Sequence, residues 1–263
     1  MSEWKGRTAL ITGASYGIGE AFSHRLAADG ANLVLTARSI NRLESLANSL
    51  RLRYQTEIFT IPADLSAGGA QGIFAATESK GLSVELLVNN AGFGALGEFA
   101  ALSLERQLEM IEVNIKSLVA LTHLYLPTML ERRRGAVLNV ASTASFQAVP
   151  YFAVYAATKA FVLSFSEALW AECAERGVRV TALCPGSTAT HFQEVAGSGS
   201  RRGPKVVQTA EEVVDVGLRA LARGRSHVVS GRMNALQTQL ERFVPRDVVT
   251  RLAGRIFRPE HLR

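Results

Sequence analysis

The sequence predicts an α/β fold in which one doubly wound parallel sheet of about seven strands is covered by helices on both faces. Short, continuous apolar runs alternate with amphipathic segments along the chain, a pattern typical of parallel strands joined by helices. The 263 residues, 48% of them hydrophobic, are enough for one large core. The sequence shows neither an interdomain linker nor a repeat beyond this alternation, so we expect residues 1–263 to form a single domain.

The predicted strands are short runs rich in Val, Leu and Ile that end near Gly, Asn, Asp or Pro. In chain order they are Arg7–Thr12, Ala31–Ala37, Glu57–Leu65, Val84–Gly92, Gly135–Ser142, Val178–Gly186 and His227–Gly231. Between them apolar residues recur at helical spacing, and a glycine ends the first such segment. The predicted helices are Gly19–Gly30, Ile40–Arg53, roughly 104–131 and roughly 151–176.

Two segments after the sixth strand have a distinct composition. Residues 194–208 are rich in Gly, Ser and basic residues and follow a strand end, where ligands of open α/β sheets bind. We therefore expect residues 187–208 to form a lid over the substrate, with an ordinary surface loop as the alternative. The tail, residues 233–263, has apolar residues at helical spacing among arginines. We expect it to pack on its own domain or a neighbouring subunit, and a peripheral membrane contact is the alternative.

The formal net charge of +6 comes from the end of the chain, because residues 201–263 hold 13 Lys and Arg against 6 Asp and Glu. A solvated surface is the simplest interpretation, and an anionic substrate carrier or an acidic membrane surface are the alternatives. The arginines form no recognised nucleic-acid module. Cys173 and Cys184 lack metal-type spacing, the sequence has no long apolar run, and its first residues do not show the pattern expected of a signal peptide. We expect a reduced, cytoplasmic protein without a metal site.

The first predicted strand and helix are joined by a glycine-rich turn, "TGASYGIG" (Thr12–Gly19). Its glycines allow backbone to approach a pyrophosphate, and the helix N-terminus offers unpaired N–H groups to phosphate. This setting predicts a Rossmann-type dinucleotide site, and a glycine turn without a ligand is the alternative. The residues expected to contact the cofactor here are Gly13, Ser15, Tyr16, Gly17, Ile18 and Gly19.

The end of the second strand selects the cofactor. A carboxylate there would accept hydrogen bonds from the ribose hydroxyls and repel a 2′-phosphate, but this chain has Ala37 followed by Arg38. We therefore expect NADP(H) rather than NAD(H), with Arg38 pairing with the phosphate. Asp64 follows the third strand and either accepts a hydrogen bond from the adenine amine or caps the next turn. At the end of the fourth strand, small residues and amides let the cofactor lie close to backbone or stabilise a turn. These residues are Asn90, Ala91 and Gly92.

Together these motifs resemble those of the classical short-chain dehydrogenase/reductase (SDR) family, over roughly residues 7–192. The matching pieces are "TGASYGIG", "ADL", "NNAG", the Asn of "EVNIKS", the Ser of "VAST", "YAATK" and "PGSTAT". Most are weak singly, but in this order and spacing they are specific. The resemblance implies a nicotinamide-dependent oxidoreductase that needs no metal and forms dimers or tetramers through its long helices.

Tyr155 and Lys159 are four residues apart and therefore share one helical face. Because an ammonium favours the phenolate, we expect Lys159 to lower the pKa of Tyr155 from about 10 and make it a general acid/base; a solvated helical pair is the alternative. The resemblance implies that Tyr155 protonates the forming alkoxide and that Lys159 also holds the nicotinamide ribose. It further implies that Ser142 holds the substrate oxygen and that Asn114 orders a water linked to Lys159. It extends the cofactor site to Tyr155, Lys159, Pro185, Gly186, Thr188 and Thr190.

The expected activity is direct hydride transfer from NADPH to a ketone or aldehyde, reversibly, with a small carbonyl or alcohol compound as substrate. A 3-oxoacyl-thioester reductase, whose basic tail would meet an acyl carrier protein, is the first alternative. A non-catalytic NADP(H)-sensing protein is an alternative of another class. Four phenylalanines near the motifs either line an apolar substrate pocket or pack in the core: Phe93, Phe146, Phe152 and Phe192.

Overall fold

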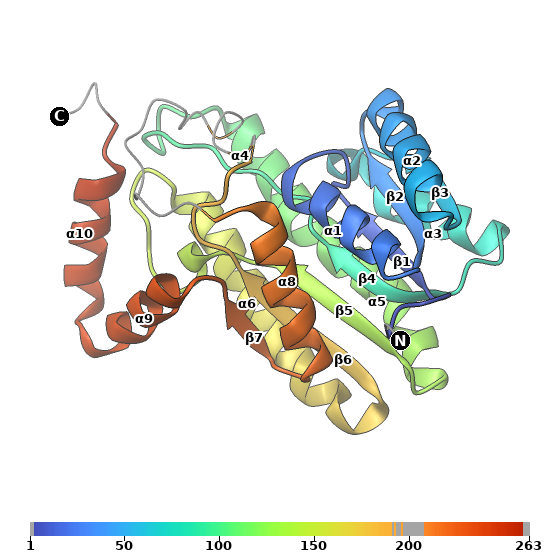
Figure 1. Cartoon of the computed structure of the whole chain (residues 1–263). Helices are drawn as coiled ribbons and strands as arrows, with labels where there is room; N and C mark the ends of the chain where they lie inside the picture. The colour runs from blue at the N-terminus through green and yellow to red at the C-terminus, as the bar shows by residue number, and fades with distance from the viewer. Residues whose placement is uncertain (1–2, 191, 193–195, 197–207, 260–263) are drawn as a thin grey trace.

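A seven-stranded parallel sheet lies at the centre of the protein, in strand order β3-β2-β1-β4-β5-β6-β7 (Figure 1). The computed structural model describes residues 3–190, 192, 196 and 208–259. Every pair of neighbouring strands is parallel, so the predicted fold class is confirmed. The strands are β1 (Thr8–Thr12), β2 (Asn32–Ala37), β3 (Ile58–Pro62), β4 (Val84–Asn89), β5 (Gly135–Val140), β6 (Val178–Cys184) and β7 (His227–Val229).

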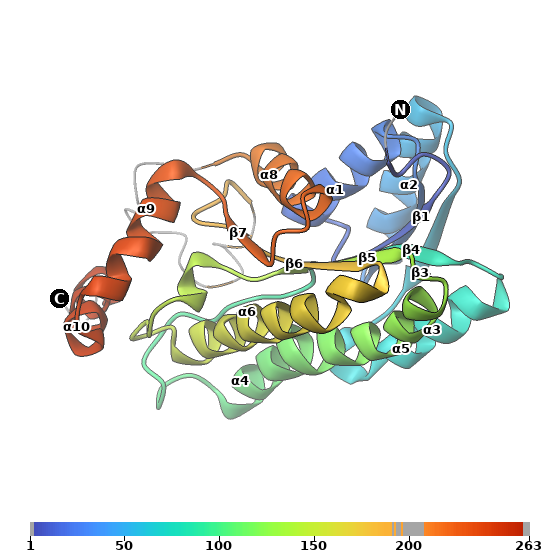
Figure 2. The ribbon, with the colours of Figure 1, turned by 90° about the horizontal axis from the view of Figure 1, so that it is seen from below.

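Helices cover both faces of the sheet (Figure 2). On one face lie α1 (Gly17–Ala28), α2 (Ile40–Tyr54) and α8 (Ala210–Ala222), and on the other lie α3 (Gly69–Ser79), α4 (Leu104–Ile111), α5 (Ser117–Glu131) and α6 (Ala153–Cys173). The chain continues into α9 (Arg232–Leu240) and α10 (Arg246–Phe257), which lie at one end of the molecule. None of the helices in the described part of the chain combines the length and the apolar character needed to cross a bilayer.

The sheet separates two large cores because successive side chains of a strand point to opposite faces. Leu33 and Leu35 of β2 pack in the core beneath α1, α2 and α8, whereas Val34 between them packs beneath α3 and α5. All three side chains are fully buried. Burial on both faces explains why these strands are continuous apolar runs in the sequence rather than alternating ones.

Two helices of the described part of the chain, α3 and α8, were not predicted from the sequence. The α3 segment has two glycines and few large apolar residues, so its periodicity is weak. The signal for α8 was present: the Thr209 hydroxyl accepts a hydrogen bond from the Glu212 amide at 3.2 Å, and the Glu212 carboxylate accepts one from the Thr209 amide at 3.1 Å. This is a capping box, and its Thr-x-x-Glu spacing can be read from sequence.

Two predicted helices differ from the observed ones. The helix predicted over 104–131 is divided by a π-helical turn, Glu112–Lys116, between α4 and α5. The helix predicted to begin near 151 begins at Ala153, because Tyr151 has a φ of 64° and Phe152 is also non-helical. Most of the predicted lid, residues 187–208, lies outside the described residues. Its two ends are paired, since Thr188 forms a parallel bridge with Gln208.

Candidate active site

The glycine turn after β1 is packed so closely that side chains are excluded. A Cβ atom on Gly19 would lie 2.2 Å from the carbonyl oxygen of Gly13. Gly13 has a φ of 64°, and its Cβ would lie 3.0 Å from the Cα of Ala91. The two residues therefore have to be glycine, and the backbone of the turn is exposed where α1 begins. This is the geometry of a dinucleotide-binding turn.

The end of β4 is fastened to the same turn. The Asn90 side-chain amide donates to the carbonyl oxygens of Thr12 at 2.9 Å and Gly13 at 3.2 Å. The Thr12 hydroxyl accepts hydrogen bonds from the backbone amides of Asn90 at 3.0 Å and Ala91 at 2.9 Å. Asn90 thus shapes the turn with its side chain. Sequence reasoning assigned no role to Thr12, although its hydroxyl at the strand end next to the glycines is a typical partner for backbone amides.

The segment after β6 closes against the glycine turn. A Cβ atom on Gly17 would lie 2.8 Å from Cγ2 of Thr190. The Thr188 hydroxyl donates to the Gly186 carbonyl oxygen at 3.1 Å, and the Pro185 carbonyl oxygen accepts from the Thr143 amide at 2.9 Å. The predicted residues after β6 therefore lie between the glycine turn and the segment that carries Ser142. Within the glycine turn, Ser15 and Tyr16 directly precede α1, and the ring centre of Tyr16 lies 3.9 Å from the Arg42 guanidinium. Ile18, in the first turn of α1, packs on the core.

The predicted acid and its partner meet beyond the end of β5. The Ser142 side chain lies close enough to the Tyr155 phenol to influence its pKa, and both residues are buried. Ser142 begins the short 3-10 turn Thr143–Ser145, and its hydroxyl also accepts from the Ala144 amide at 3.1 Å. Tyr155 lies in the first turn of α6. The 3-10 turn and α6 therefore bring the side chains of Ser142 and Tyr155 next to each other.

Lys159 and Asn114 lie next to this pair. The Lys159 ammonium donates to the Val140 carbonyl oxygen at 2.7 Å and is 5.9 Å from the centre of the Tyr155 ring. The Asn114 amide donates to the Phe93 carbonyl oxygen and to the Thr158 hydroxyl, each at 3.0 Å. Its side-chain oxygen accepts from the Phe93 amide at 3.1 Å. A Cβ atom on Gly92 would lie 2.9 Å from Asn114 Oδ1 and 3.2 Å from Lys159 Nζ, so all four predicted catalytic residues and the end of β4 converge on one site.

Burial dominates the ionisation of this site. It raises the pKa of Tyr155 to about 12, and the hydrogen bond from Ser142 opposes the rise. It lowers the pKa of Lys159 to about 8, because the buried ammonium loses its water shell. The expectation that Lys159 lowers the pKa of Tyr155 was wrong for this structure. The physical reason is that desolvation of both groups outweighs their mutual attraction, and the ammonium points to the Val140 carbonyl oxygen.

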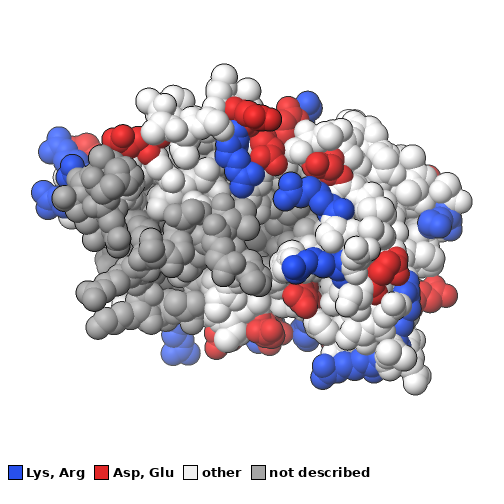
Figure 3. All heavy atoms as spheres, turned by 90° about the horizontal axis from the view of Figure 1, so that it is seen from above, with Lys and Arg blue, Asp and Glu red and all other residues white. Residues whose placement is uncertain are grey.

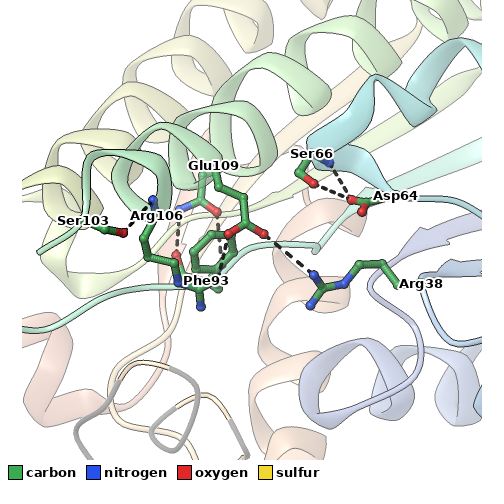
Figure 4. A network of polar contacts seen from close by, with 8 residues as sticks. Arg38, Asp64, Ser66, Phe93, Ser103, Arg106 and Glu109 are labelled. Carbon is green, nitrogen blue, oxygen red and sulfur yellow. Dashed lines mark hydrogen bonds and ion pairs between the residues drawn. The ribbon is translucent and has the colours of Figure 1, made fainter.

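At the predicted phosphate-binding end, Arg38 has an acidic partner that the sequence did not indicate (Figure 4). Arg38 is 70% exposed, and its Nη1 lies 3.7 Å from Oε1 of Glu109, which comes from α4. Asp64 caps the turn that follows β3, accepting from the Ser66 amide at 2.9 Å and the Ser66 hydroxyl at 2.6 Å. These hydrogen bonds from Ser66 lower the pKa of Asp64, and the positive charge of Arg38 adds to the effect. Of the two roles open to Asp64, capping is the one that this structure displays.

Aromatic rings surround Tyr155. The ring centre of Phe152 lies 4.4 Å from that of Tyr155, and the ring centre of Phe192 lies 5.4 Å from it. Phe257 of α10 stacks on Phe152 at 6.3 Å and had no signal in the sequence. Phe146, in contrast, packs beside His227 in a separate cluster, and Phe93 lies beneath the Arg106 guanidinium. Of the four predicted pocket phenylalanines, Phe152 and Phe192 therefore lie beside the Tyr155 ring, and Phe93 packs in the same apolar cluster.

Seen from above, basic and acidic side chains are interspersed on this face of the molecule (Figure 3). The site described here lies at the carboxyl ends of the parallel strands, next to the point where β1 and β4 become neighbours and the strand order reverses. Crevices at this point bind ligands in doubly wound sheets. The arrangement offers a backbone cradle for a dinucleotide and, beside it, two hydroxyl groups and an ammonium for acid–base chemistry.

Comparison with known proteins agrees with this geometry. A family model described as short chain dehydrogenase matches residues 7–200. The chain is 34% identical to a 7beta-hydroxysteroid dehydrogenase of Collinsella aerofaciens, covering 89% of each sequence. It is 36% identical to hydroxysteroid dehydrogenase-like protein 1 of Gallus gallus, covering 75% of this chain but only 60% of that protein. It is 30% identical to a very-long-chain 3-oxoacyl-CoA reductase of Rattus norvegicus, covering 90% and 76%.

Solved structures share the fold. A 7beta-hydroxysteroid dehydrogenase aligns with a TM-score of 0.87 at 32% identity, covering 96% of this chain and 98% of that one. A short-chain dehydrogenase from Sphingobium yanoikuyae in complex with NADPH aligns at 0.78 and 30%, covering 90% and 94%. One from Burkholderia phymatum in complex with NAD aligns at 0.81 and 26%, covering 92% and 95%. The matched family model, these relatives and the site geometry together establish that this chain belongs to the short-chain dehydrogenase/reductase family of oxidoreductases.

Proposed function

We propose that this chain is an NADPH-dependent oxidoreductase that reduces a ketone or aldehyde to an alcohol, and oxidises the alcohol in reverse. The observation that carries the proposal is the buried cluster of Tyr155, Ser142 and Lys159, in which the Ser142 side chain acts on the Tyr155 phenol and Lys159 lies one turn further along α6. Two hydroxyl groups placed side by side can both turn toward one carbonyl oxygen, where negative charge develops during reduction.

NADPH, when bound, supplies the hydride, and the chain's own residues act on the substrate oxygen. Ser142 donates a hydrogen bond to this oxygen, and Tyr155 transfers its phenolic proton to it. Because burial raises the pKa of Tyr155 to about 12, the phenol carries its proton at neutral pH and is ready to act as an acid. The Lys159 ammonium stabilises the phenolate that forms, and a proton from solvent restores the phenol.

The cofactor preference rests on Arg38. Its exposed guanidinium follows β2, where it can pair bidentately with a 2′-phosphate. The rest of the dinucleotide would be held by the glycine turn, the Asn90–Gly92 segment and residues 185–190. These segments contact one another so closely that backbone atoms, rather than side chains, would face the cofactor at the strand ends. The relatives are divided on this point, since the Sphingobium protein holds NADPH and the Burkholderia protein holds NAD.

The substrate that fits best is an apolar, bulky ketone. Phe152 and Phe192 flank Tyr155, and Phe257 extends the aromatic wall. Similarity to hydroxysteroid dehydrogenases supports this class. A 3-oxoacyl thioester is the second candidate, favoured by the similarity to the very-long-chain 3-oxoacyl-CoA reductases. Retention of Ser142, Tyr155, Lys159 and Asn114 in one site argues against a non-catalytic NADP(H) sensor.

Three further expectations belong to this proposal. Residues 187–208 close over the substrate as a lid, anchored by the pairing of Thr188 with Gln208. The chain assembles into a homo-oligomer, as enzymes of this family commonly do. It acts in the cytoplasm, in keeping with two cysteines that are buried and unpaired.

The proposal is tested by NADPH oxidation with a panel of ketones, aldehydes and 3-oxoacyl thioesters. Tyr155→Phe removes only the phenolic hydroxyl, so we expect turnover to fall by about a thousandfold or more while NADPH binding is retained. Tyr125→Phe is the matched control, because Tyr125 is also buried, is hydrogen-bonded to Thr77 at 2.8 Å, and also has a pKa raised by burial to about 12. The control should keep its turnover. Near-normal turnover of Tyr155→Phe would refute the proposed role.

A further inference from the structure

Arg38, the guanidinium proposed to bind phosphate, already has an anionic partner. Glu109 of α4 approaches it through Oε1, with 3.7 Å between this oxygen and Arg38 Nη1. The two residues are 71 positions apart in the sequence, and Glu109 reaches Arg38 from α4 (Figure 4). The sequence has no acid at the end of β2, but the tertiary structure brings one to the same place.

Glu109 is held in position from its other side. Its Oε2 accepts a hydrogen bond from Arg106 Nη1 at 2.8 Å, and its side chain is 25% exposed. The Arg106 guanidinium in turn lies 3.9 Å above the ring of Phe93. Phe93 is fixed through both of its backbone polar groups by Asn114. The carboxylate is therefore a built feature at the edge of the cofactor site, because the residues behind it are themselves fastened to the catalytic centre.

We propose that Glu109 is a cofactor-selectivity residue, whose carboxylate competes with the ribose 2′-phosphate of NADP(H) for the Arg38 guanidinium. This inference rests on the proposed function, specifically on the pairing of Arg38 with the phosphate. A phosphate that pairs bidentately with Arg38 takes the donors that face Glu109, and it brings a second anion close to the carboxylate. Glu109 therefore moderates the preference for NADPH that Arg38 creates.

The competition has a distinct signature for each ligand. NAD(H) carries a hydroxyl group in place of the 2′-phosphate, so its binding brings no second anion to this end of the site. Removing the charge of Glu109 should therefore tighten NADPH and leave NADH unchanged. Because Arg38 is largely exposed, the effect is modest and is screened by salt. A purely structural role of Glu109 would affect both nucleotides and would not depend on salt.

The test is calorimetric measurement of Kd for NADPH, NADH and adenosine 2′,5′-bisphosphate, with thermal unfolding to confirm folding. Glu109→Gln keeps the shape and an acceptor for Arg106. We expect it to tighten NADPH and the bisphosphate by roughly threefold to fivefold at low salt, the scale of one exposed ion pair, with the gain disappearing at high salt. Glu109→Asp keeps the negative charge but moves it away from Arg38, because the side chain is shorter, so the gain in NADPH affinity should be smaller. Glu105→Gln is the matched control, since Glu105 is an exposed acid one turn earlier on α4, and it should leave all three Kd values unchanged.

Arg38→Ala separates this inference from the proposed function. If Arg38→Ala leaves NADPH affinity unchanged, Arg38 does not bind the phosphate, and both the cofactor assignment and the role of Glu109 are wrong. If Arg38→Ala weakens NADPH binding but Glu109→Gln leaves it unchanged or weakens it, only the role of Glu109 is overturned. When both are right, Glu109→Gln has no effect in the Arg38→Ala background, because the guanidinium for which the anions compete is gone.

Discussion

At the residue scale, Lys159 is a buried ammonium in the candidate active site. It is 4% exposed and donates to the Val140 carbonyl oxygen at 2.7 Å. Desolvation is the largest influence on this ammonium and lowers its pKa from 10.5 to about 8, while the nearby Cys184 opposes the shift. The ammonium therefore loses its proton within reach of physiological pH, which makes both catalysis and folding sensitive to pH here.

The first prediction concerns this pH dependence. Between pH 8 and 10.5 Lys159 binds fewer protons in the folded chain than in the unfolded chain. The free energy of unfolding of the wild type should therefore rise with pH relative to that of Lys159→Met, by at most about 1.4 kcal/mol per pH unit. Urea unfolding of both proteins at several pH values measures this difference.

Comparing the two proteins cancels the contributions of groups that do not interact with Lys159, whereas the pKa of Cys184 is itself lowered by Lys159 and changes in the variant. Burial raises the pKa values of Tyr155 and Cys184 to about 12, and these groups impose the opposite slope on both proteins as pH rises. If the difference between wild type and Lys159→Met stays constant from pH 8 to pH 10, the depressed pKa of Lys159 is wrong.

The second prediction concerns Gly19. In Gly19→Ala the new Cβ would lie 2.2 Å from the Gly13 carbonyl oxygen and 2.6 Å from the Asn90 amide nitrogen, so the turn has to move. We expect a loss of about 1–3 kcal/mol of stability and a loss of nucleotide affinity of roughly tenfold or more. Thermal unfolding and Kd for NADPH measure the two effects.

Gly72→Ala is the control for this substitution. Gly72 lies inside α3 with nothing within 4 Å of a new Cβ. The change should stabilise the protein by about 0.5–1 kcal/mol, because alanine is the better helix former, and should not alter nucleotide binding. A Gly19→Ala variant with unchanged nucleotide affinity would contradict the tight turn described here.

At the scale of elements, α10 packs against the residues around Tyr155. Ala253 is buried, and a Cβ on Gly254 would lie 3.3 Å from Cγ of Pro150. These small residues allow α10 to approach the loop that precedes α6, and Phe257 then stacks on Phe152 beside Tyr155. A helix more than 70 residues beyond α6 thereby contributes to the wall around the reactive hydroxyl.

The third prediction is that Phe257→Ala changes selectivity between substrates. Without this ring Phe152 loses its stacking partner, so KM for a bulky apolar ketone should rise several-fold, roughly the effect of about 1 kcal/mol from an aromatic pair. KM for a small ketone should change little. Leu252→Ala is the matched control, since Leu252 is an apolar residue of α10 that is 51% exposed. Equal changes for small and bulky ketones would argue that α10 supports the fold without touching the substrate.

The π-helical turn between α4 and α5 acts at the same scale. It spans Glu112–Lys116 and carries Asn114, which is 1% exposed. A π turn inserts an extra residue into the helical repeat, which changes the direction of the side chains around it. Here it allows Asn114 to donate hydrogen bonds to both Phe93 and Thr158, and these bonds link the segment after β4 to α6. The same helix carries Glu109 one turn earlier, so one element serves both ends of the cofactor site.

At the scale of the whole molecule, charge and apolar surface are unevenly distributed. The positive excess lies in residues 201–263, and α9 and α10 extend from one end of the molecule (Figure 1). These helices and the 3-10 turn Glu241–Phe243 between them expose apolar side chains as well, among them Met233, Leu236, Leu240, Phe243, Leu252 and Ile256. The contacts of Ala253 and Phe257 show that α10 packs on its own domain. That packing agrees with the simpler of the two interpretations of the tail.

The sequence by itself determined the sheet and the glycine turn, and it singled out the residues that we propose for catalysis. Continuous apolar runs indicate strands buried on both faces of the sheet, and Gly13 and Gly19 indicate close contact between backbone segments. Only a few residue types satisfy each of these two local requirements. The spacing of Tyr155 and Lys159 places them on one helical face for the same reason.

Only the tertiary structure decided how these groups behave. Glu109 reaches Arg38 and Phe257 reaches Phe152 from elements far along the chain, and no local pattern encodes such approaches. Asp64 has a capping partner two residues away, yet the sequence left that role and adenine binding equally open. Burial removes water from both groups, Tyr155 and Lys159, and it therefore raises the pKa of Tyr155 and lowers the pKa of Lys159. Desolvation is a property of the packed core, so it cannot be read from the spacing of two residues.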